Sequence, residues 1–195
     1  MMLSHSPLSF QPERLQLLQT MPIARKLTSC EPPYEARLHK LLEANPALFG
    51  DDWIWIGSQI RTQAGKIIDL VAIDAWGRVF GVNVHRRVDG PTALCDSLPS
   101  LAWLENLQPD DIDNMCAIYR GADLQTVLAR RCDTPPSREF INAETGFVIV
   151  VSDAQRARPA TQMLHDRGAN LWMMEFACFG DPRAPTLVFT AIVGL

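Results

Sequence analysis

Residues 65–87 form the segment GKIIDLVAIDAWGRVFGVNVHRR, from which the centre of the fold can be predicted. It contains two runs rich in apolar and β-branched residues, Lys66–Asp74 and Arg78–His85, separated only by residues 75–77. Such runs are typical of strands, and a three-residue connection that contains glycine is typical of a hairpin. The stretch therefore predicts two adjacent antiparallel strands.

The short connection also predicts how the two strands pair. If Asp74 lies opposite Arg78, the residue numbers of paired positions add up to 152, and Asp69 then lies directly opposite Asn83. Directly opposed residues have Cβ atoms about 4.5–5.5 Å apart. His85 shares the face of Asn83, because side chains two positions apart on a strand point the same way. The hairpin is thus predicted to bring a carboxylate, an amide and an imidazole together.

The flanking patterns predict further helices and strands. The residues before the hairpin predict a helix over Tyr34–Ala44, stopped by Asn45-Pro46, and a strand over Trp53–Arg61. The residues after the hairpin predict helices over Thr92–Asn106, Asp111–Tyr119, Leu124–Arg131 and Ala154–Arg167, and strands over Gly146–Val151, Leu171–Phe176 and Thr186–Val193. Pro99 predicts a kink or a late start in the first of these later helices.

These elements define the fold class as α/β, a mixed central sheet flanked by helices. An antiparallel meander of three strands is followed by a βαβ unit, and residues 34–195 form one domain. Residues 1–33 are punctuated by prolines and predict only a short strand or turn of helix at Leu15–Leu18.

Composition narrows the class of protein. Of the 195 residues 47% are hydrophobic, the net charge is −4, and no apolar run approaches the roughly 20 residues that cross a bilayer. The five cysteines contain no C-x-x-C pair, which predicts reduced thiols rather than a disulfide framework or a zinc site. The first residues lack the pattern of a secretory signal, so we expect a soluble cytoplasmic protein.

Three stretches carry a resemblance to a known superfamily. YEARLHKLLEANPALFG (34–50) has a helix glutamate followed by N-P-x-L, the hairpin contains G-x-x-x-D-L, and ALCDSLPSLAWLENL (93–107) is the helix that follows. Together they resemble the PD-(D/E)XK, or restriction-endonuclease-like, nucleases of the RecB and NucS type. In those nucleases the second hairpin strand carries E-x-K and the following helix carries a Gln.

The resemblance assigns the candidate catalytic positions residue by residue. Glu35 matches the helix glutamate and Asp69 the metal-binding aspartate. Asn83 and His85 stand where the Glu and Lys of E-x-K belong, and Asp96 falls near the helix Gln. Two of the expected groups are kept and three are replaced.

These replacements weaken the chemistry that the resemblance implies. Magnesium prefers oxygen ligands that include carboxylates, so Asp69 beside Asn83 predicts weak metal binding at best. A lysine would supply a fixed cation to the reaction, whereas His85 is mostly neutral near pH 7 unless its pKa is raised. We therefore expect a divergent, catalytically inactive nuclease-fold protein that binds DNA, RNA or a protein partner of nucleic-acid metabolism. The cofactor is none, or Mg²⁺ if the chain is active.

Basic residues near the hairpin suggest how nucleic acid would be bound. Arg61, Arg86 and Arg87 are the candidate backbone contacts, and Lys66 and Arg78 on the neighbouring strands extend the same stripe. The alternative is a solvated edge whose charges keep other strands from pairing with it.

Two other functions stay open. One is an active Mg²⁺-dependent deoxyribonuclease with a rearranged site, in which Glu35 or Asp96 supplies the missing carboxylate. The other is a protein-interaction or scaffold domain with no nucleic-acid role, which the acidic pI of about 5.5 favours. The sequence leaves the oligomeric state open and is compatible with a homodimer.

Overall fold

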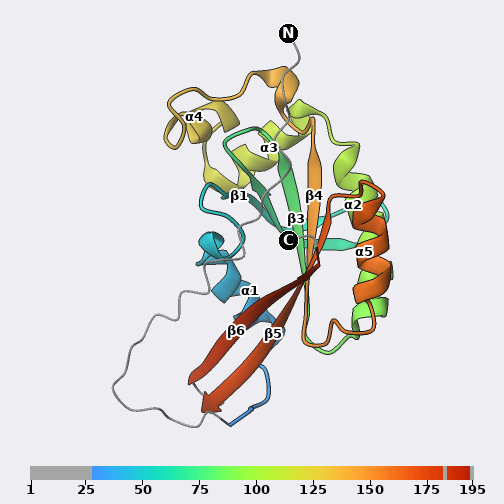
Figure 1. Cartoon of the computed structure of the whole chain (residues 1–195). Coiled ribbons are helices and arrows are strands. Elements are labelled where there is room, and N and C mark those ends of the chain that lie inside the picture. The colour runs from blue at the N-terminus through green and yellow to red at the C-terminus, as the bar shows by residue number, and fades with distance from the viewer. Residues whose placement is uncertain (1–27, 182–183, 194–195) are drawn as a thin grey trace.

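One mixed sheet of six strands, in the order β1-β2-β3-β4-β5-β6, forms the centre of the molecule (Figure 1). The structure is a computed structural model that describes residues 28–181 and 184–193. The strands are β1 (Ile54–Arg61), β2 (Ile67–Ile73), β3 (Val79–His85), β4 (Thr145–Val151), β5 (Leu171–Asp181) and β6 (Ala184–Val193). β1 to β3 form an antiparallel meander, β3, β4 and β5 run parallel, and β6 returns antiparallel to β5. The predicted fold class is confirmed.

Helices cover both faces of this sheet (Figure 1). They are α1 (Glu35–Glu43), α2 (Gly90–Glu105), α3 (Pro109–Arg120), α4 (Leu124–Ala129) and α5 (Arg158–Asp166), with short 3-10 turns at Pro46–Leu48 and Arg138–Phe140. The buried side chains of α1 join one hydrophobic cluster, and those of α2, α3 and α4 join the cluster on the opposite face. Among the described residues, no helix has the length and apolar character needed to span a membrane.

Prolines in the first turn explain where α2 and α5 begin. α2 begins at Gly90, with Asp89 as its cap and Pro91 in its first turn, whereas the prediction placed the start at Thr92. Pro99 lies inside this helix and does not mark a late start. Proline is tolerated in the first turn, where its missing N–H has no intrahelical partner. Pro159 occupies such a position in α5, which therefore begins at Arg158, whereas the prediction placed the start at Ala154.

The turn between β2 and β3 fixes the register of the hairpin. The main-chain N–H of Asp74 donates to the carbonyl of Arg78 at 3.1 Å, and Gly77 has the left-handed φ of 86° that the turn requires. The paired positions Leu70 with Val82 and Ile73 with Val79 each add up to 152. The predicted register is confirmed, and its continuation sets Asp69 against Asn83.

β5 extends well beyond the strand beside it. Only residues 171–175 pair with β4, while the pairing with β6 continues to Asp181 (Figure 1). Residues 28–30 pair with the free edge that remains: Cys30 N–H donates to Cys178 O at 3.0 Å, and Gly180 N–H donates to Thr28 O at 2.9 Å. The described structure therefore starts before the predicted domain boundary at residue 34. The predicted element at Leu15–Leu18 lies outside the described residues.

Candidate functional site

The candidate site lies at the end of the β2–β3 hairpin that is farthest from its turn. There the side-chain oxygens of Asp69 and Asn83, in place of main-chain carbonyls, accept hydrogen bonds between the two strands. Val84 N–H donates to Asp69 Oδ2 at 2.7 Å, and Asp69 N–H donates to Asn83 Oδ1 at 3.2 Å. The two predicted residues thus meet, but each side chain binds the main chain of the opposite strand.

A residue of β1 donates a hydrogen bond to the second oxygen of the Asp69 carboxylate. β1 has a register shift between Trp55 and Gly57, and Gln59 then adopts a left-handed φ of 54°. Its Nε2 donates to Asp69 Oδ1 at 2.8 Å. A left-handed conformation is unfavourable for a residue other than glycine, and such strain is concentrated at functional sites. Both oxygens of Asp69 are therefore engaged, and no sequence signal pointed to Gln59.

His85 lies next to this pair, facing α2. Its Nε2 is 3.4 Å from Ser97 Oγ, a contact that the sequence did not suggest. Burial lowers the pKa of His85, while the carboxylates of Asp69 and Asp96 raise it and the ammonium of Lys66 lowers it. Burial is the largest effect, so His85 is a neutral imidazole near pH 7.

Lys66 brings a cation directly to one of the predicted catalytic positions, Asp96. Its Nζ is 2.8 Å from Asp96 Oδ1, and the two side chains are about half exposed. This ion pair joins the start of β2 to α2, and Lys66 lowers the pKa of Asp96. The sequence predicted that Lys66 belongs to the basic stripe, and it matched Asp96 to the position of the helix Gln in the resembled nucleases without a partner. Their pairing depends on how α2 packs, which sequence spacing does not give.

Glu35 lies near the same end of the sheet, at the start of α1. Its pKa is raised, first by partial burial and then by the negative charge of Asp69, while Arg86 lowers it. The structure thus brings all five predicted catalytic positions into one neighbourhood, although Glu35 is linked to the others through charge rather than through a hydrogen bond.

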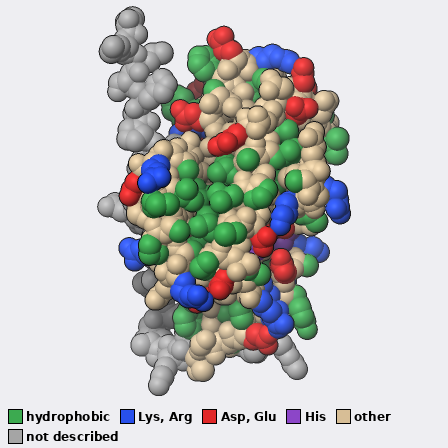
Figure 2. All heavy atoms as spheres, turned by 90° about the vertical axis from the view of Figure 1, so that its right-hand side faces the viewer, with side chains coloured by type: hydrophobic (Ala, Val, Ile, Leu, Met, Phe, Trp, Pro, Cys, Tyr) green, Lys and Arg blue, Asp and Glu red, His purple; other side chains and the backbone are tan. Residues whose placement is uncertain are grey.

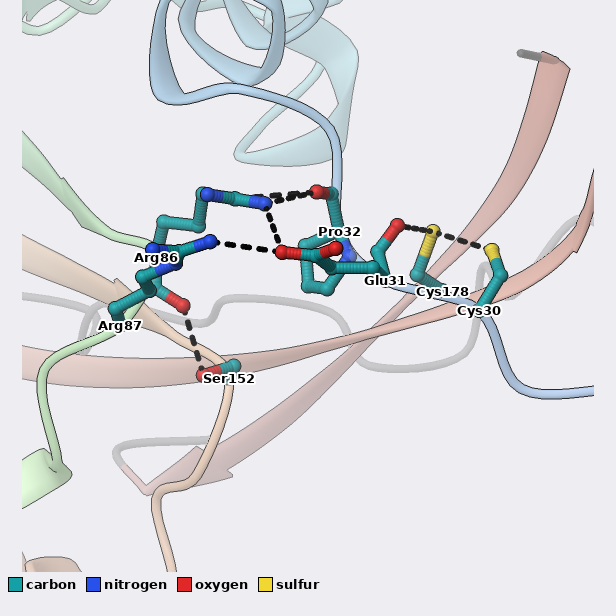
Figure 3. A network of polar contacts seen from close by, with 7 residues as sticks. All are labelled: Cys30, Glu31, Pro32, Arg86, Arg87, Ser152 and Cys178. Carbon is teal, nitrogen blue, oxygen red and sulfur yellow. Dashed lines mark hydrogen bonds and ion pairs between the residues drawn. The ribbon is translucent and has the colours of Figure 1, made fainter. Parts of the chain in front are cut away.

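The predicted arginines are found in different settings. Arg61 is exposed at the end of β1. Arg86 and Arg87 both donate to one oxygen of Glu31, at 2.9 and 2.8 Å, and Arg86 also donates to the carbonyl of Pro32 (Figure 3). Together the two guanidinium groups lower the pKa of Glu31.

One part of the predicted basic stripe is wrong. Arg78 lies at the opposite end of the hairpin, where its Nε donates to Asp74 Oδ2 at 2.5 Å. Asp74 is fully buried, so Arg78 is needed to compensate its charge and cannot join Arg61 and Lys66.

The side chains present do not fit a magnesium ion held by carboxylates. Both oxygens of Asp69 and the Oδ1 of Asn83 already accept hydrogen bonds, and Asp96 is paired with Lys66. Magnesium demands near-octahedral oxygen ligands and gives up its waters reluctantly. Within residues 28–181 and 184–193, no group of three His, Cys, Asp or Glu side chains is arranged to hold a metal ion.

Comparison with known proteins gives two loose structural likenesses. No family model and no curated protein matches the sequence. A repair endonuclease from Pyrococcus abyssi aligns with 14% identity and a TM-score of 0.38, covering 76% of this chain and 50% of that one. A chain of an EndoMS–dsDNA2 complex aligns with 14% identity and a TM-score of 0.36, covering 78% of this chain and 49% of that one. This chain spans about half the length of each of these two proteins. The fold class therefore rests on the strand order and connections described above.

Proposed function

We propose that this chain is a catalytically inactive, restriction-endonuclease-like domain that binds the backbone of nucleic acid. One observation carries the proposal. Asp69, the carboxylate that the resemblance assigns to the metal, has both oxygens engaged by the neighbouring strands, through Gln59 Nε2 and Val84 N–H. The end of the hairpin is thus built as a closed structural junction rather than as an open ligand set.

The neighbouring groups support inactivity. Metal-dependent cleavage of a phosphodiester needs negative ligands for the ion and positive charge where the transition state becomes negative. His85 is held neutral by burial, and the charge of Lys66 is balanced by Asp96 at 2.8 Å. Neither side chain supplies an uncompensated cation to a reacting phosphate. No magnesium or other cofactor belongs to the proposed function.

The proposed binding surface consists of Arg61, Arg86 and Arg87. Arginine recognises carboxylates and phosphates with the same planar donors, so the carboxylate of Glu31 occupies Arg86 and Arg87 as a phosphate oxygen would. Contacts of this kind hold the backbone and carry no sequence information. Binding at the pair requires Glu31 to move away, and we therefore expect modest affinity.

The first experiment measures binding and cleavage in parallel. Fluorescence anisotropy with short DNA and RNA probes, single and double stranded, should show binding that falls steeply with salt. Each lost backbone contact on duplex DNA should reduce the slope of log K against log salt by about 0.9. Arg87→Ala is the informative variant, because its side chain is mostly exposed and we expect its loss to leave the fold intact. The matched control is Arg130→Ala, an exposed arginine at the end of α4, which should leave the slope unchanged.

Incubation of the same probes with Mg²⁺ or Mn²⁺ should produce no cleavage. A sharper test restores the motif: Asn83→Glu returns a carboxylate opposite Asp69, and His85→Lys returns the cation two residues along. In a true nuclease scaffold this double variant should bind Mn²⁺ more tightly than the wild type, and adding Asp69→Ala should abolish the gain. Wild-type cleavage that disappears in Asp69→Ala would instead identify an active enzyme with a rearranged site.

A second candidate function, a protein-interaction domain, is favoured by the surface of α2 and α5. Figure 2 shows hydrophobic side chains gathered over the centre of this face. Leu98 of α2 and Met163 of α5 are 37% and 46% exposed. Exposed apolar clusters are often sites of protein contact. Failure of every DNA and RNA probe to bind even at low salt would favour this candidate over the first.

A further inference from the structure

Two cysteines that are 148 positions apart in the sequence meet at the edge of β5. The Sγ atoms of Cys30 and Cys178 are 3.1 Å apart (Figure 3). Their backbones are also paired, since Cys30 N–H donates to Cys178 O and the neighbouring residues Ser29 and Phe179 form a bridge. Directly opposed residues of this kind have Cα atoms about 5.5 Å apart, which lies within the range of disulfides. The backbone pairing therefore already brings the two cysteines to a separation that a disulfide can span.

The short segment that contains Cys30 also covers the arginine pair. Glu31 follows Cys30 directly and receives hydrogen bonds from Arg86 and Arg87, and Arg86 further donates to Pro32 O at 2.7 and 3.1 Å. The Arg86 guanidinium lies 5.6 Å from the centre of the Tyr34 ring. Residues 28–34 therefore form a strap, anchored on β5 at one end and on Arg86 at the other.

The main-chain anchor on β5 is weak. It consists of the two hydrogen bonds that form the bridge between Ser29 and Phe179, and residues 28 and 29 are exposed. Short, exposed pairings of this kind open with low free energy. A disulfide at Cys30 would hold this end of the strap covalently to β5, while leaving Glu31 in its place.

We propose that Cys30 and Cys178 are a redox pair whose disulfide locks the strap over Arg86 and Arg87. Reduction frees the strap to lift, which removes Glu31 from the two guanidinium groups. The consequence for ligands rests on the proposed nucleic-acid function, because the anion admitted to Arg86 and Arg87 would then be a backbone phosphate. The disulfide itself does not depend on that function.

The oxidant is a small-molecule disulfide of the glutathione class. The thiolate of Cys30, the more exposed of the two, attacks one sulfur of the oxidant and expels one thiolate, leaving a mixed disulfide. The Cys178 thiolate then attacks the Cys30 sulfur and expels the second. Two protein thiols lose two electrons and two protons, and one oxidant disulfide becomes two thiols.

The second step should be slow at neutral pH. The side chain of Cys178 is only 4% exposed, and burial is the largest of the effects that raise its pKa, so this effect remains when Cys30 is in the mixed disulfide. The thiolate is the nucleophile, so the rate of ring closure should rise as the pH is raised from about 7 to about 9. The lock is therefore expected to respond to sustained oxidation.

The first experiment detects the bond. The full chain is incubated with oxidised glutathione, free thiols are alkylated, and the digest is analysed by mass spectrometry. We expect a peptide pair joined through Cys30 and Cys178, and we expect Cys95, an exposed thiol of α2, to carry glutathione or the alkyl label. Cys95→Ser should leave the cross-link intact and Cys30→Ser should abolish it. Recovery of Cys30 and Cys178 as separately labelled peptides after full oxidation would overturn the proposal.

The second experiment follows the strap by hydrogen exchange. The N–H groups of Cys30 and Gly180, which make the two bonds of the anchor, should exchange at least about tenfold more slowly in the oxidised protein than in the reduced one. Equal exchange in the two states would show that the bond does not lock the strap. The Cys30→Ser variant should behave like the reduced protein under both conditions.

Binding to a short duplex DNA at low salt then separates the two proposals. Reduced protein should bind more tightly than oxidised protein. Glu31→Ala should narrow this difference, because Arg87 is then free of Glu31 in both states while Pro32 O still holds Arg86 in the oxidised protein. A cross-link that slows exchange, with no DNA binding in either state, would support the lock and count against the nucleic-acid function. DNA binding that is equal in both states of the wild type would show that the strap does not control the arginines.

Discussion

Two aspartates five residues apart, Asp69 in β2 and Asp74 just after its last residue, differ in a way that explains how the hairpin is built. Asp74 is fully buried at the turn and accepts bonds from the N–H groups of Trp76 and Arg78 and from Arg78 Nε. Asp69 is half-buried at the other end and accepts bonds from Gln59 Nε2 and Val84 N–H, which are both neutral donors.

The two carboxylates stabilise the same hairpin by different routes. Asp74 ends a continuous ladder and is held by a cation four residues away, although burial still raises its pKa. Asp69 interrupts the ladder, because it and Asn83 replace main-chain acceptors with side-chain ones. The turn is therefore the rigid end of the hairpin, and the site end is the one that side-chain changes can open.

The largest expected effect is at the turn. Asp74→Ala would leave the N–H groups of Trp76 and Arg78 and the guanidinium of Arg78 without their buried acceptor. Removing one partner of a buried ion pair costs about 3–5 kcal/mol of unfolding free energy. Urea unfolding followed by circular dichroism measures it, with the exposed Asp133→Ala as a control expected within about 0.5 kcal/mol of wild type. A cost below about 1 kcal/mol would refute the view of the turn as the rigid end.

A smaller loss is expected at the site end. Asp69→Ala removes the acceptor of Val84 N–H and of Gln59 Nε2, which should cost about 1–3 kcal/mol in the same unfolding measurement. Asp69→Asn keeps one carbonyl oxygen and should cost less. If Asp69→Ala proved as destabilising as Asp74→Ala, the contrast between the two ends would be wrong.

The protonation of His85 gives a pH-dependent test of the site end of the hairpin. Because burial lowers its pKa, the unfolded chain binds the proton more readily than the native one, and stability should fall as pH drops from about 6.5 toward the native pKa. Proton NMR of the His85 ring measures the native value directly. Asp69→Asn should lower that value further, since the charge of Asp69 raises it. A native pKa at or above the ordinary histidine value would contradict the inference that His85 is neutral at pH 7.

The smallest effect concerns the ion pair between Lys66 and Asp96. Because both side chains are about half exposed, Lys66→Ala should change the unfolding free energy by no more than about 1 kcal/mol. The same substitution should raise the pKa of His85, because Lys66 lowers it, and Asp96→Asn should lower it. Shifts of the same sign in both variants would show that the pair does not act on His85 through charge.

The hairpin and its register could be predicted because local signals determine them. The connection at residues 75–77 sets the pairing, and alternation along β2 and β3 carries it to Asp69 and Asn83. The order of later elements followed from apolar periodicity in the same way. The starts of α2 and α5 do not follow from the pattern alone, because a proline can lie in a first turn or inside a helix.

What sequence could not give is the set of contacts between distant segments. Lys66 meets Asp96 because α2 packs on the sheet, and Cys30 meets Cys178 because residues 28–30 return to β5. Neither contact follows from a local pattern in the sequence. Gln59 donates to Asp69 from a left-handed conformation within β1, and one such residue inside a strand leaves no clear mark on composition.

The pairing of residues 28–30 with β5 has a practical consequence for anyone who trims the chain. A version that starts at residue 34, where the helical pattern begins, would strip the partner from Cys178 and Gly180 and leave their main-chain groups on an open strand edge. Open edges recruit further strands, so the shortened protein should self-associate at concentrations where a version that starts at residue 28 does not.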